Sequence, residues 1–174
     1  KVINLGRKLF LLIVLAKYTN PETVASFGLY WSTLVLSSGM MGLEVYSHTA
    51  RSIIQDTTHR NIQLRKHLGF LLIISCIVTP IISAIFGKLT TVTSLIILLF
   101  PLHLLFEFFS QEITRLLVPL KMPLASITLA FIRSSLWIFP VMLAIFLGKN
   151  TDVLEFTIVL WLLGSFVALV VGGG

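Results

Sequence analysis

The run LGFLLIISCIVTPIISAIF, residues 68–86, decides the fold class of this chain. It contains no charged side chain, and its length is close to the roughly 20 residues that an α-helix needs to cross a bilayer. Backbone groups in lipid must pair with one another, so only helices and closed barrels span membranes. Barrel strands have about ten residues of alternating polarity, a pattern that this run lacks. The run therefore predicts a transmembrane helix.

Similar apolar runs lie on both sides of this one. Turn residues separate most of them, as in Thr19-Asn20-Pro21 and Lys121-Met122-Pro123. The predicted spans are residues 2–18, 26–47, 68–86, 93–118, 124–147 and 154–171. The sequence therefore predicts an all-α fold, a polytopic membrane helix bundle of about six transmembrane helices that forms one unit over residues 1–174.

The composition supports the same fold class. The chain is 56% hydrophobic and 11% charged, with a mean hydropathy of +0.99. Soluble domains carry roughly 25% charged residues, and a soluble chain of this size leaves too much surface outside its core to hide so many apolar side chains. Membrane lipids are therefore the first expected partners.

Lysine and arginine residues are unevenly distributed between the predicted connections. If the N-terminus is cytoplasmic, the cytoplasmic ends hold Lys1, Arg7, Lys8, Arg51, Arg60, Arg65, Lys66, Arg115 and Lys121, and the external ends hold Lys17, Lys88 and Lys149. Cytoplasmic loops carry an excess of such residues, so we predict a multi-pass protein of the plasma membrane with this orientation. The polar segment 47–67 is predicted to be a cytosolic helix extension plus a loop.

The same bias accounts for the net charge of +6, and no basic and aromatic module predicts nucleic-acid binding. The chain begins with Lys1, and its last apolar run leads directly into Gly172-Gly173-Gly174. We expect it to be a piece of a longer protein.

Arg133 is the most informative polar residue inside a predicted span. It lies about ten residues into the fifth span, roughly 15 Å deep at 1.5 Å per residue. A charge at that depth is energetically expensive and usually faces the bundle interior or a wet cavity. Arg133 could contact an anion, such as a phosphate or an acidic sugar. It could equally form a structural ion pair with an acidic residue of a neighbouring helix, such as Glu107.

The fourth span carries a second group of polar residues. His103, Glu107 and Gln111 repeat at i, i+4 and i+8 and so share one helix face, which Arg115 continues. This face could line a transport cavity, with Glu107 as a proton-linked carboxylate, or form a polar seam between helices. Glu112 and Arg115, at i and i+3 near the inner interface, are predicted to form a structural ion pair.

Glu44, His48 and Arg51 form a third stripe at the end of the second span. A Glu–Arg pair near the interface can anchor a helix end, and Glu44 and Arg51 are also candidates for a substrate cavity. The histidines lack the spacing of a metal site, so no metal is predicted.

Motifs for catalysis are missing from the sequence. It contains no GxSxG, P-loop or GxGxxG segment, so we expect neither an enzyme nor a cofactor. Pro80, Pro101 and Pro140 fall inside the third, fourth and fifth spans, where each removes a helical hydrogen bond and favours a kink.

Four stretches of the chain resemble the polysaccharide or O-antigen flippases (Wzx-type) of the multidrug/oligosaccharidyl-lipid/polysaccharide exporter superfamily. The first resembles the segment A-x-Y-L-x-P-E-x-x-G-x-Y that joins the first two spans of that family, although Asn20 stands where a small Ser or Gly is usual. The matching residues are Ala16-Lys17-Tyr18, Pro21-Glu22 and Phe27-Gly28-Leu29-Tyr30, then Gly42-Leu43-Glu44-Val45-Tyr46 with Arg51, Glu107 with Gln111-Glu112 and Arg115, and Arg133 with Trp137.

The resemblance implies the N-terminal lobe of a transporter with 12 to 14 spans. Such proteins flip undecaprenyl-diphosphate-linked oligosaccharides across the bacterial inner membrane by alternating access, for polysaccharide or lipopolysaccharide biosynthesis, and a polysaccharide polymerase is an implied partner. By resemblance, Arg133 and Arg51 would meet the diphosphate or anionic sugars, and Glu44 and Glu107 would serve in gating or coupling.

Three alternatives remain open at the level of sequence. One is a drug or ion antiporter of the same superfamily, which would use intramembrane acids and an aromatic cavity; Arg133 argues mildly against it. The others are an integral membrane enzyme and a structural subunit of envelope glycan assembly. A wet, positive cavity at Arg133 would favour the flippase, whereas a fully packed bundle would favour the structural subunit.

Overall fold

The computed structural model describes the backbone of residues 2–42, 45–55, 58–90, 92–147 and 152–173. Over these residues the chain is helical and contains no strand, which confirms the all-α prediction. The helices are α1 (Val2–Tyr18), α2 (Pro21–Gly42), α3 (Val45–Gln55), α4 (Arg60–Leu89), α5 (Ser94–Leu116), α6 (Pro123–Phe131), α7 (Ile138–Phe146) and α8 (Val153–Gly173). A π-helical turn, η1 (Ile132–Leu136), joins α6 to α7, so these three elements form one interrupted helix.

Four of these helices are long and apolar enough to cross a membrane, among the residues that the structure describes. They are α4, α5, the interrupted helix Pro123–Phe146, and α8. These four helices indicate, by their length and composition, a multi-pass membrane protein. The first and second predicted spans fall on α1 and α2. In α1 the described apolar part is the shorter Leu9–Tyr18, and in α2 serine, threonine and glycine dilute the apolar residues.

The second predicted span, residues 26–47, covers most of α2 and the first residues of α3, with residues 43–44 outside the described part of the chain. Segment 47–67, predicted to be a helix extension and a loop, is mainly a helical hairpin made of α3 and the first two turns of α4.

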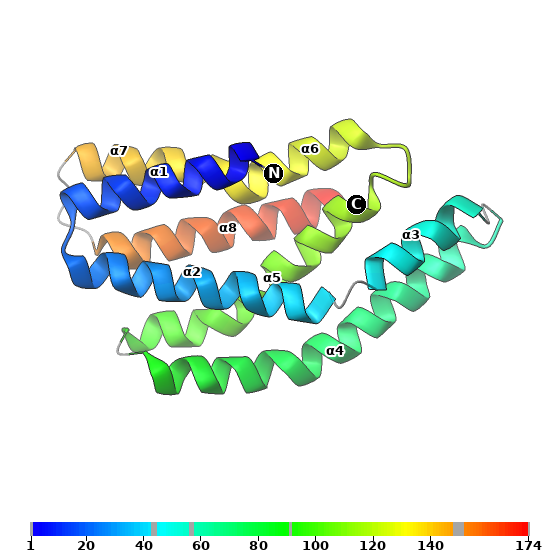
Figure 1. Cartoon of the computed structure of the whole chain (residues 1–174), viewed down its shortest axis with the longest axis horizontal. Coiled ribbons are helices and arrows are strands. Elements are labelled where there is room, and N and C mark those ends of the chain that lie inside the picture. Colours follow the sequence, from blue (N-terminus) through cyan, green and yellow to red (C-terminus); the bar gives the residue numbers. More distant parts are fainter. Residues whose placement is uncertain (1, 43–44, 56–57, 91, 148–151, 174) are drawn as a thin grey trace.

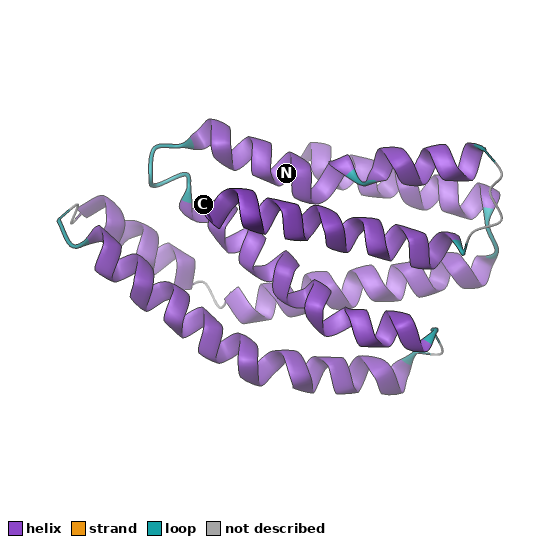
Figure 2. Ribbon diagram, turned by 180° about the vertical axis from the view of Figure 1, so that it is seen from behind, coloured by secondary structure: helices purple, strands orange, loops and turns teal. Residues whose placement is uncertain are grey.

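The long helices run roughly alongside one another, and α5 and α8 make the most extensive contact (Figure 1). The views from both sides place α1 next to α7, and α2 beside α4 and α5 (Figures 1 and 2). The α1–α2 turn lies at one end of the bundle. The α3–α4 hairpin projects beyond the other end, where the α5–α6 connection also lies (Figure 1). Pro80 and Pro101 lie inside α4 and α5, as predicted.

Aromatic rings fill the centre of the bundle. Phe86 and Phe100 stack at a centroid distance of 4.2 Å, and Trp137 stacks on Trp161 at 5.2 Å. Tyr30 packs edge-on against Phe100. On the outside, many large apolar side chains are exposed, as a bilayer allows. Because lipid is as apolar as leucine, close packing and buried polar contacts hold such helices together rather than the hydrophobic effect.

Candidate functional site

Arg133 lies in the π-helical turn η1. The local sequence explains this wider turn. Pro140 has no N–H, and its ring would collide with the carbonyl group of Leu136 four residues earlier in a regular α-helix. The hydroxyl of Ser134 also donates a hydrogen bond of 2.6 Å to the carbonyl oxygen of Ala130. Single π turns inside α-helices occur frequently at functional sites, so the position of Arg133 marks this turn as a candidate.

Glu107 of α5 is the partner of Arg133. Its Oε1 lies 3.6 Å from Nε of Arg133, and its Oε2 accepts a hydrogen bond of 2.7 Å from the hydroxyl of Ser165 in α8. Only 14% of the Arg133 side chain and 8% of the Glu107 side chain are exposed. The pairing with Glu107, one of the two predicted roles of Arg133, is therefore present in the structure. Nε and Nη1 of Arg133 are buried and make no hydrogen bond within the described part of the chain.

A glycine in α8 lets η1 approach closely. A Cβ atom added at Gly164 would lie 3.3 Å from the carbonyl oxygen of Ile132 and 3.2 Å from Cδ1 of Trp137. The indole N–H of Trp137 donates a hydrogen bond of 3.1 Å to the carbonyl oxygen of Arg133. Gly164 precedes Ser165, so the same stretch of α8 admits the π turn and supplies the hydroxyl for Glu107. Three elements, η1, α5 and α8, therefore build this site, which we call the Glu107 cluster (Glu107, Arg133 and Ser165).

His103 is buried one turn before Glu107, as their shared face predicted. The two residues contact different helices. Nδ1 of His103 lies 2.7 Å from the hydroxyl of Tyr30 in α2, and its ring packs edge-on against Trp161 at 4.8 Å. His103 thus joins α2, α5 and α8 through a polar contact inside the aromatic core.

The predicted pair of Glu112 and Arg115 is present, with Oε1 and Nη1 2.7 Å apart. Its surroundings extend beyond α5. Oε2 of Glu112 lies 3.6 Å from Nε2 of His67 in α4, and Nδ1 of His67 lies 2.8 Å from the hydroxyl of Thr49 in α3. This arrangement, the Glu112 seam (Glu112, Arg115, His67 and Thr49), connects the α3–α4 hairpin to α5. Glu107 and Glu112 therefore lie on the same helix but contact different partners. Glu107 contacts η1 and α8, whereas Glu112 contacts α4 and Arg115 of its own helix.

Gln111 and Arg51 make none of the contacts that define the Glu107 cluster. Gln111 is half-buried on α5, and Arg51 is exposed on α3. Glu44 lies outside the described residues. Among the described residues, His, Cys, Asp and Glu form no group of three or more that could hold a metal ion.

The sequence did not predict the contacts of four residues in these sites. Tyr30 and Ser165 are ordinary residues of apolar helices, and their roles depend on how far each helix is rotated. Thr49 and His67 lie in the polar segment, where such residues are common. A pairing rule for residues within one helix finds Glu112 with Arg115, whereas contacts between helices require the packed structure.

An open apolar groove of about 500 Å³ runs between α2 and α4. Leu36 and Met40 of α2 and Ile81 and Ile85 of α4 are among the side chains that line it, and Ser37 adds a hydroxyl. The Glu107 cluster is not part of this groove.

Comparison with known protein families, curated proteins and solved structures finds no match for this chain.

Proposed function

We propose that this chain is a lobe of a bacterial inner-membrane transporter that flips an undecaprenyl-diphosphate-linked oligosaccharide for polysaccharide biosynthesis. The observation that carries the proposal is the position of Arg133. It is an arginine at membrane depth, 3.6 Å from Glu107, with two nitrogen atoms that make no hydrogen bond among the described residues. A diphosphate that crosses lipid needs such a donor, because the N–H groups of a guanidinium make strong charge-assisted hydrogen bonds to phosphate oxygens.

Glu107 gives this donor a resting partner. An isolated charge inside a membrane is expensive, and removing one member of a buried pair leaves the other uncompensated. We infer that the diphosphate replaces Glu107 as the partner of Arg133, while Ser165 continues to donate to Glu107. The wide turn at η1 offers a place where the interrupted helix can bend during this exchange.

We also infer that α1 and α2 cross the membrane, which gives six crossings with a cytoplasmic N-terminus. Support comes from the alternation of the chain between the two ends of the bundle (Figure 1). Lys17 and Lys88 lie in the last turns of α1 and α4, whereas Arg60, Arg65 and Lys66 lie at the start of α4. The resemblance to the flippases supports the same topology and adds a second lobe beyond this chain.

One observation favours a competing function, that of a structural subunit. The Arg133 side chain is 14% exposed, and its neighbours in η1, Ser134 and Ser135, are buried. A packed ion pair of this kind can serve assembly alone. The two functions differ in what an apolar replacement of both charges does, and this difference defines the experiment.

The test is restoration of polysaccharide export in cells that lack the flippase, with variants of the complete protein. We compare Arg133→Met with the double variant Arg133→Met/Glu107→Leu, which removes both charges and leaves neither unpaired. If Arg133 binds the diphosphate, both variants lose export by about ten- to a hundredfold, the effect of one or two charge-assisted hydrogen bonds. Lys88→Met, an exposed charge at the end of α4, serves as the control and keeps export.

Membrane insertion and thermal stability of each variant are measured in parallel. The double variant is expected to insert like the parent protein and to lose only about 1–2 kcal/mol of stability, since it contains no unpaired buried charge and only the Ser165 hydroxyl loses its acceptor. Export at the parental level by this double variant would remove Arg133 from transport and assign the pair to assembly.

A further inference from the structure

The α3–α4 hairpin combines a positive charge with exposed apolar side chains. Residues 45–70 contain four basic residues, Arg51, Arg60, Arg65 and Lys66, and one acidic residue, Asp56, which gives a net charge of +3 without the histidines. The helix α3 buries Ile53 against the protein but leaves Ile54 65% exposed, and Ile62 of α4 is 51% exposed. Helices with a basic and an apolar face lie in the interface between lipid and water.

The sequence of α4 fixes the depth of this hairpin. Residues 68–87 contain no charge and extend about 30 Å at 1.5 Å per residue, which equals the thickness of the hydrocarbon core. Lys66 and His67 therefore lie within about 3 Å of its edge, and Gln63 lies about 8 Å beyond it. The headgroup layer of a bilayer occupies about 5–8 Å on each side. The space between α3 and the start of α4 thus lies at the level of the lipid phosphates.

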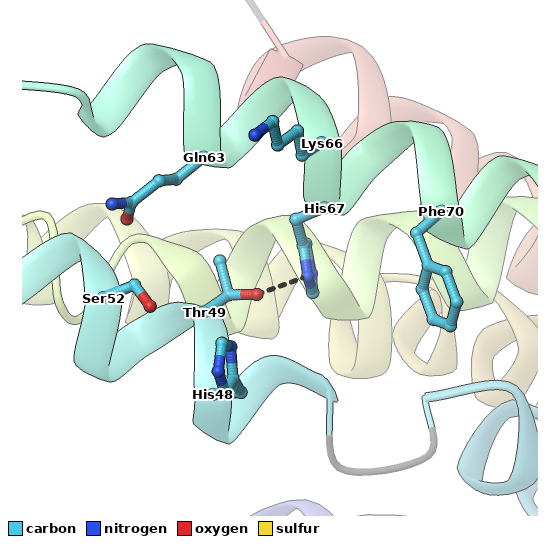
Figure 3. A pocket seen from close by; sticks show the side chains of 7 residues that line it. All are labelled: His48, Thr49, Ser52, Gln63, Lys66, His67 and Phe70. Atoms are coloured by element: carbon cyan, nitrogen blue, oxygen red, sulfur yellow. Dashed lines mark hydrogen bonds between the residues drawn. The ribbon is translucent and has the colours of Figure 1, made fainter.

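An open pocket of about 240 Å³ occupies this space (Figure 3). His48 and Ser52 line it from α3, and Gln63, Lys66 and His67 line it from α4. The side chains of Gln63 and Ser52 reach toward the space between the two helices (Figure 3). These residues offer an ammonium group, an amide, a hydroxyl and imidazoles, and the described lining includes no carboxylate. A cavity volume of about 10–15 Å³ already holds one water molecule, so the pocket has room for a phosphate group with some hydration.

One wall of the pocket is held rigid. The imidazole of His67 is buried, with Nδ1 2.8 Å from the Thr49 hydroxyl, the contact drawn in Figure 3. Nε2 of the same ring faces Oε2 of Glu112 at 3.6 Å, on the side of α5. Glu112 is itself paired with Arg115. The positive charge of Arg115 therefore compensates the carboxylate that lies next to His67. Lys66 is the lining residue that carries a full positive charge, among the described residues of the pocket.

We propose that this pocket binds the phosphate of an anionic phospholipid headgroup. A lysine at the membrane surface gains about 1 kcal/mol from anionic lipid before any direct hydrogen bond forms. The exposed Leu68, the first residue of the uncharged run of α4, gives the acyl chains of a lipid an apolar surface at the edge of the hydrocarbon core, which a free phosphate would not use. The lipid anchors the hairpin at the membrane surface, and the Glu112 seam connects this anchor to α5. This site is independent of the Glu107 cluster and of transport.

The experiment is native mass spectrometry of the intact protein, released from detergent and titrated with a short-chain phosphatidylglycerol. Phosphatidylcholine of the same chain length has the same phosphate but no net charge, and inorganic phosphate has no chain. The variants are Lys66→Gln and Ser52→Ala. Lys88→Gln is the matched control, because it removes the same charge from an exposed lysine at the opposite end of the same helix.

We expect phosphatidylglycerol to bind more tightly than phosphatidylcholine. Lys66→Gln weakens this binding about tenfold, the equivalent of one charge-assisted hydrogen bond, and Ser52→Ala weakens it less. Lys88→Gln leaves it unchanged. Equal binding of the two lipids, equal losses for Lys66→Gln and Lys88→Gln, or binding of inorganic phosphate as tight as that of the lipid would each overturn the proposal. Thermal unfolding of the apo variants confirms that each one is folded.

Discussion

Ser165 donates a hydrogen bond of 2.7 Å to Oε2 of Glu107, and this contact joins α8 to α5 at the same carboxylate that faces Arg133. A serine hydroxyl therefore fixes the orientation of a buried acid within a membrane helix bundle. The direction of the other carboxylate oxygen, toward Arg133, follows from this bond. The small hydroxyl group of Ser165 thus sets the direction of the Glu107 carboxylate.

The first prediction concerns this hydroxyl. Ser165→Ala leaves Oε2 of Glu107 buried without this donor, which costs about 1–2 kcal/mol. The free energy of unfolding in mixed detergent micelles measures the effect. Ser32→Ala is the matched control, because the Ser32 hydroxyl is exposed and bonds to its own helix, and we expect a change within about 0.5 kcal/mol. Equal effects at the two positions would contradict the proposed orienting role of Ser165.

The second prediction concerns the close approach of η1 to α8. Gly164→Ala places a methyl group 3.3 Å from the carbonyl oxygen of Ile132, so one of the two elements must shift, at a cost of about 1–3 kcal/mol. Gly28→Ala is the control, since a Cβ there meets nothing within 4 Å. It should stabilise α2 slightly, because alanine has the higher helix propensity. Unfolding temperatures of both variants are compared, and a stable Gly164→Ala protein would show that η1 has room to move.

The third prediction concerns the attachment of the α3–α4 hairpin. Thr49→Val removes the hydroxyl that contacts Nδ1 of His67 while it keeps the shape of the side chain. The buried imidazole loses this partner, and we expect faster hydrogen exchange of the backbone amides of α3, by about fivefold or more for a loss of about 1 kcal/mol. Thr128→Val is the control, because Thr128 is exposed and bonds within α6. Unchanged exchange in α3 would mean that other contacts hold the hairpin.

The fourth prediction concerns topology. Single cysteines at Lys17 and Lys88 should react with a membrane-impermeant maleimide added to intact cells, and a cysteine at Arg65 should react only after the cells are opened. Cys76 is exposed on α4 and is first replaced by serine. Labelling of Arg65→Cys in intact cells would reverse the proposed orientation, and labelling of all three positions from one side would contradict alternate crossings.

Parts of the fold and the site were predictable because they depend on one helix at a time. The length of an apolar run fixes a span to within a few residues, and the i, i+3 spacing found the pair of Glu112 and Arg115. Arg133 and Glu107 were predicted as possible partners because two opposite charges in lipid have few other options. Their contact is therefore the part of the site that elementary electrostatics anticipates.

Other features depend on how helices rotate against one another, and the sequence does not encode this locally. The stripe His103–Glu107–Gln111 was correctly placed on one face of α5. Its members nevertheless differ, because Tyr30 bonds His103, Ser165 bonds Glu107, and Gln111 is only half-buried. The sequence also did not predict the role of His67 in the wall of the pocket, because its contacts join three helices, α3, α4 and α5.

The π turn has a consequence for every residue between Pro123 and Phe146. A regular α-helix advances 100° per residue, and the extra residue of η1 shifts all later side chains by one such step. On a single helical wheel, the buried Ser126 and Leu129 of α6 therefore lie about 100° away from the buried Ile138 and Val141 of α7. The two halves share one protein-facing side only if one residue is skipped in the count. A helical wheel of this segment must therefore be drawn separately for α6 and for α7. Deletion of one residue within η1 would bring the buried faces of both halves onto the same side of one continuous α-helix.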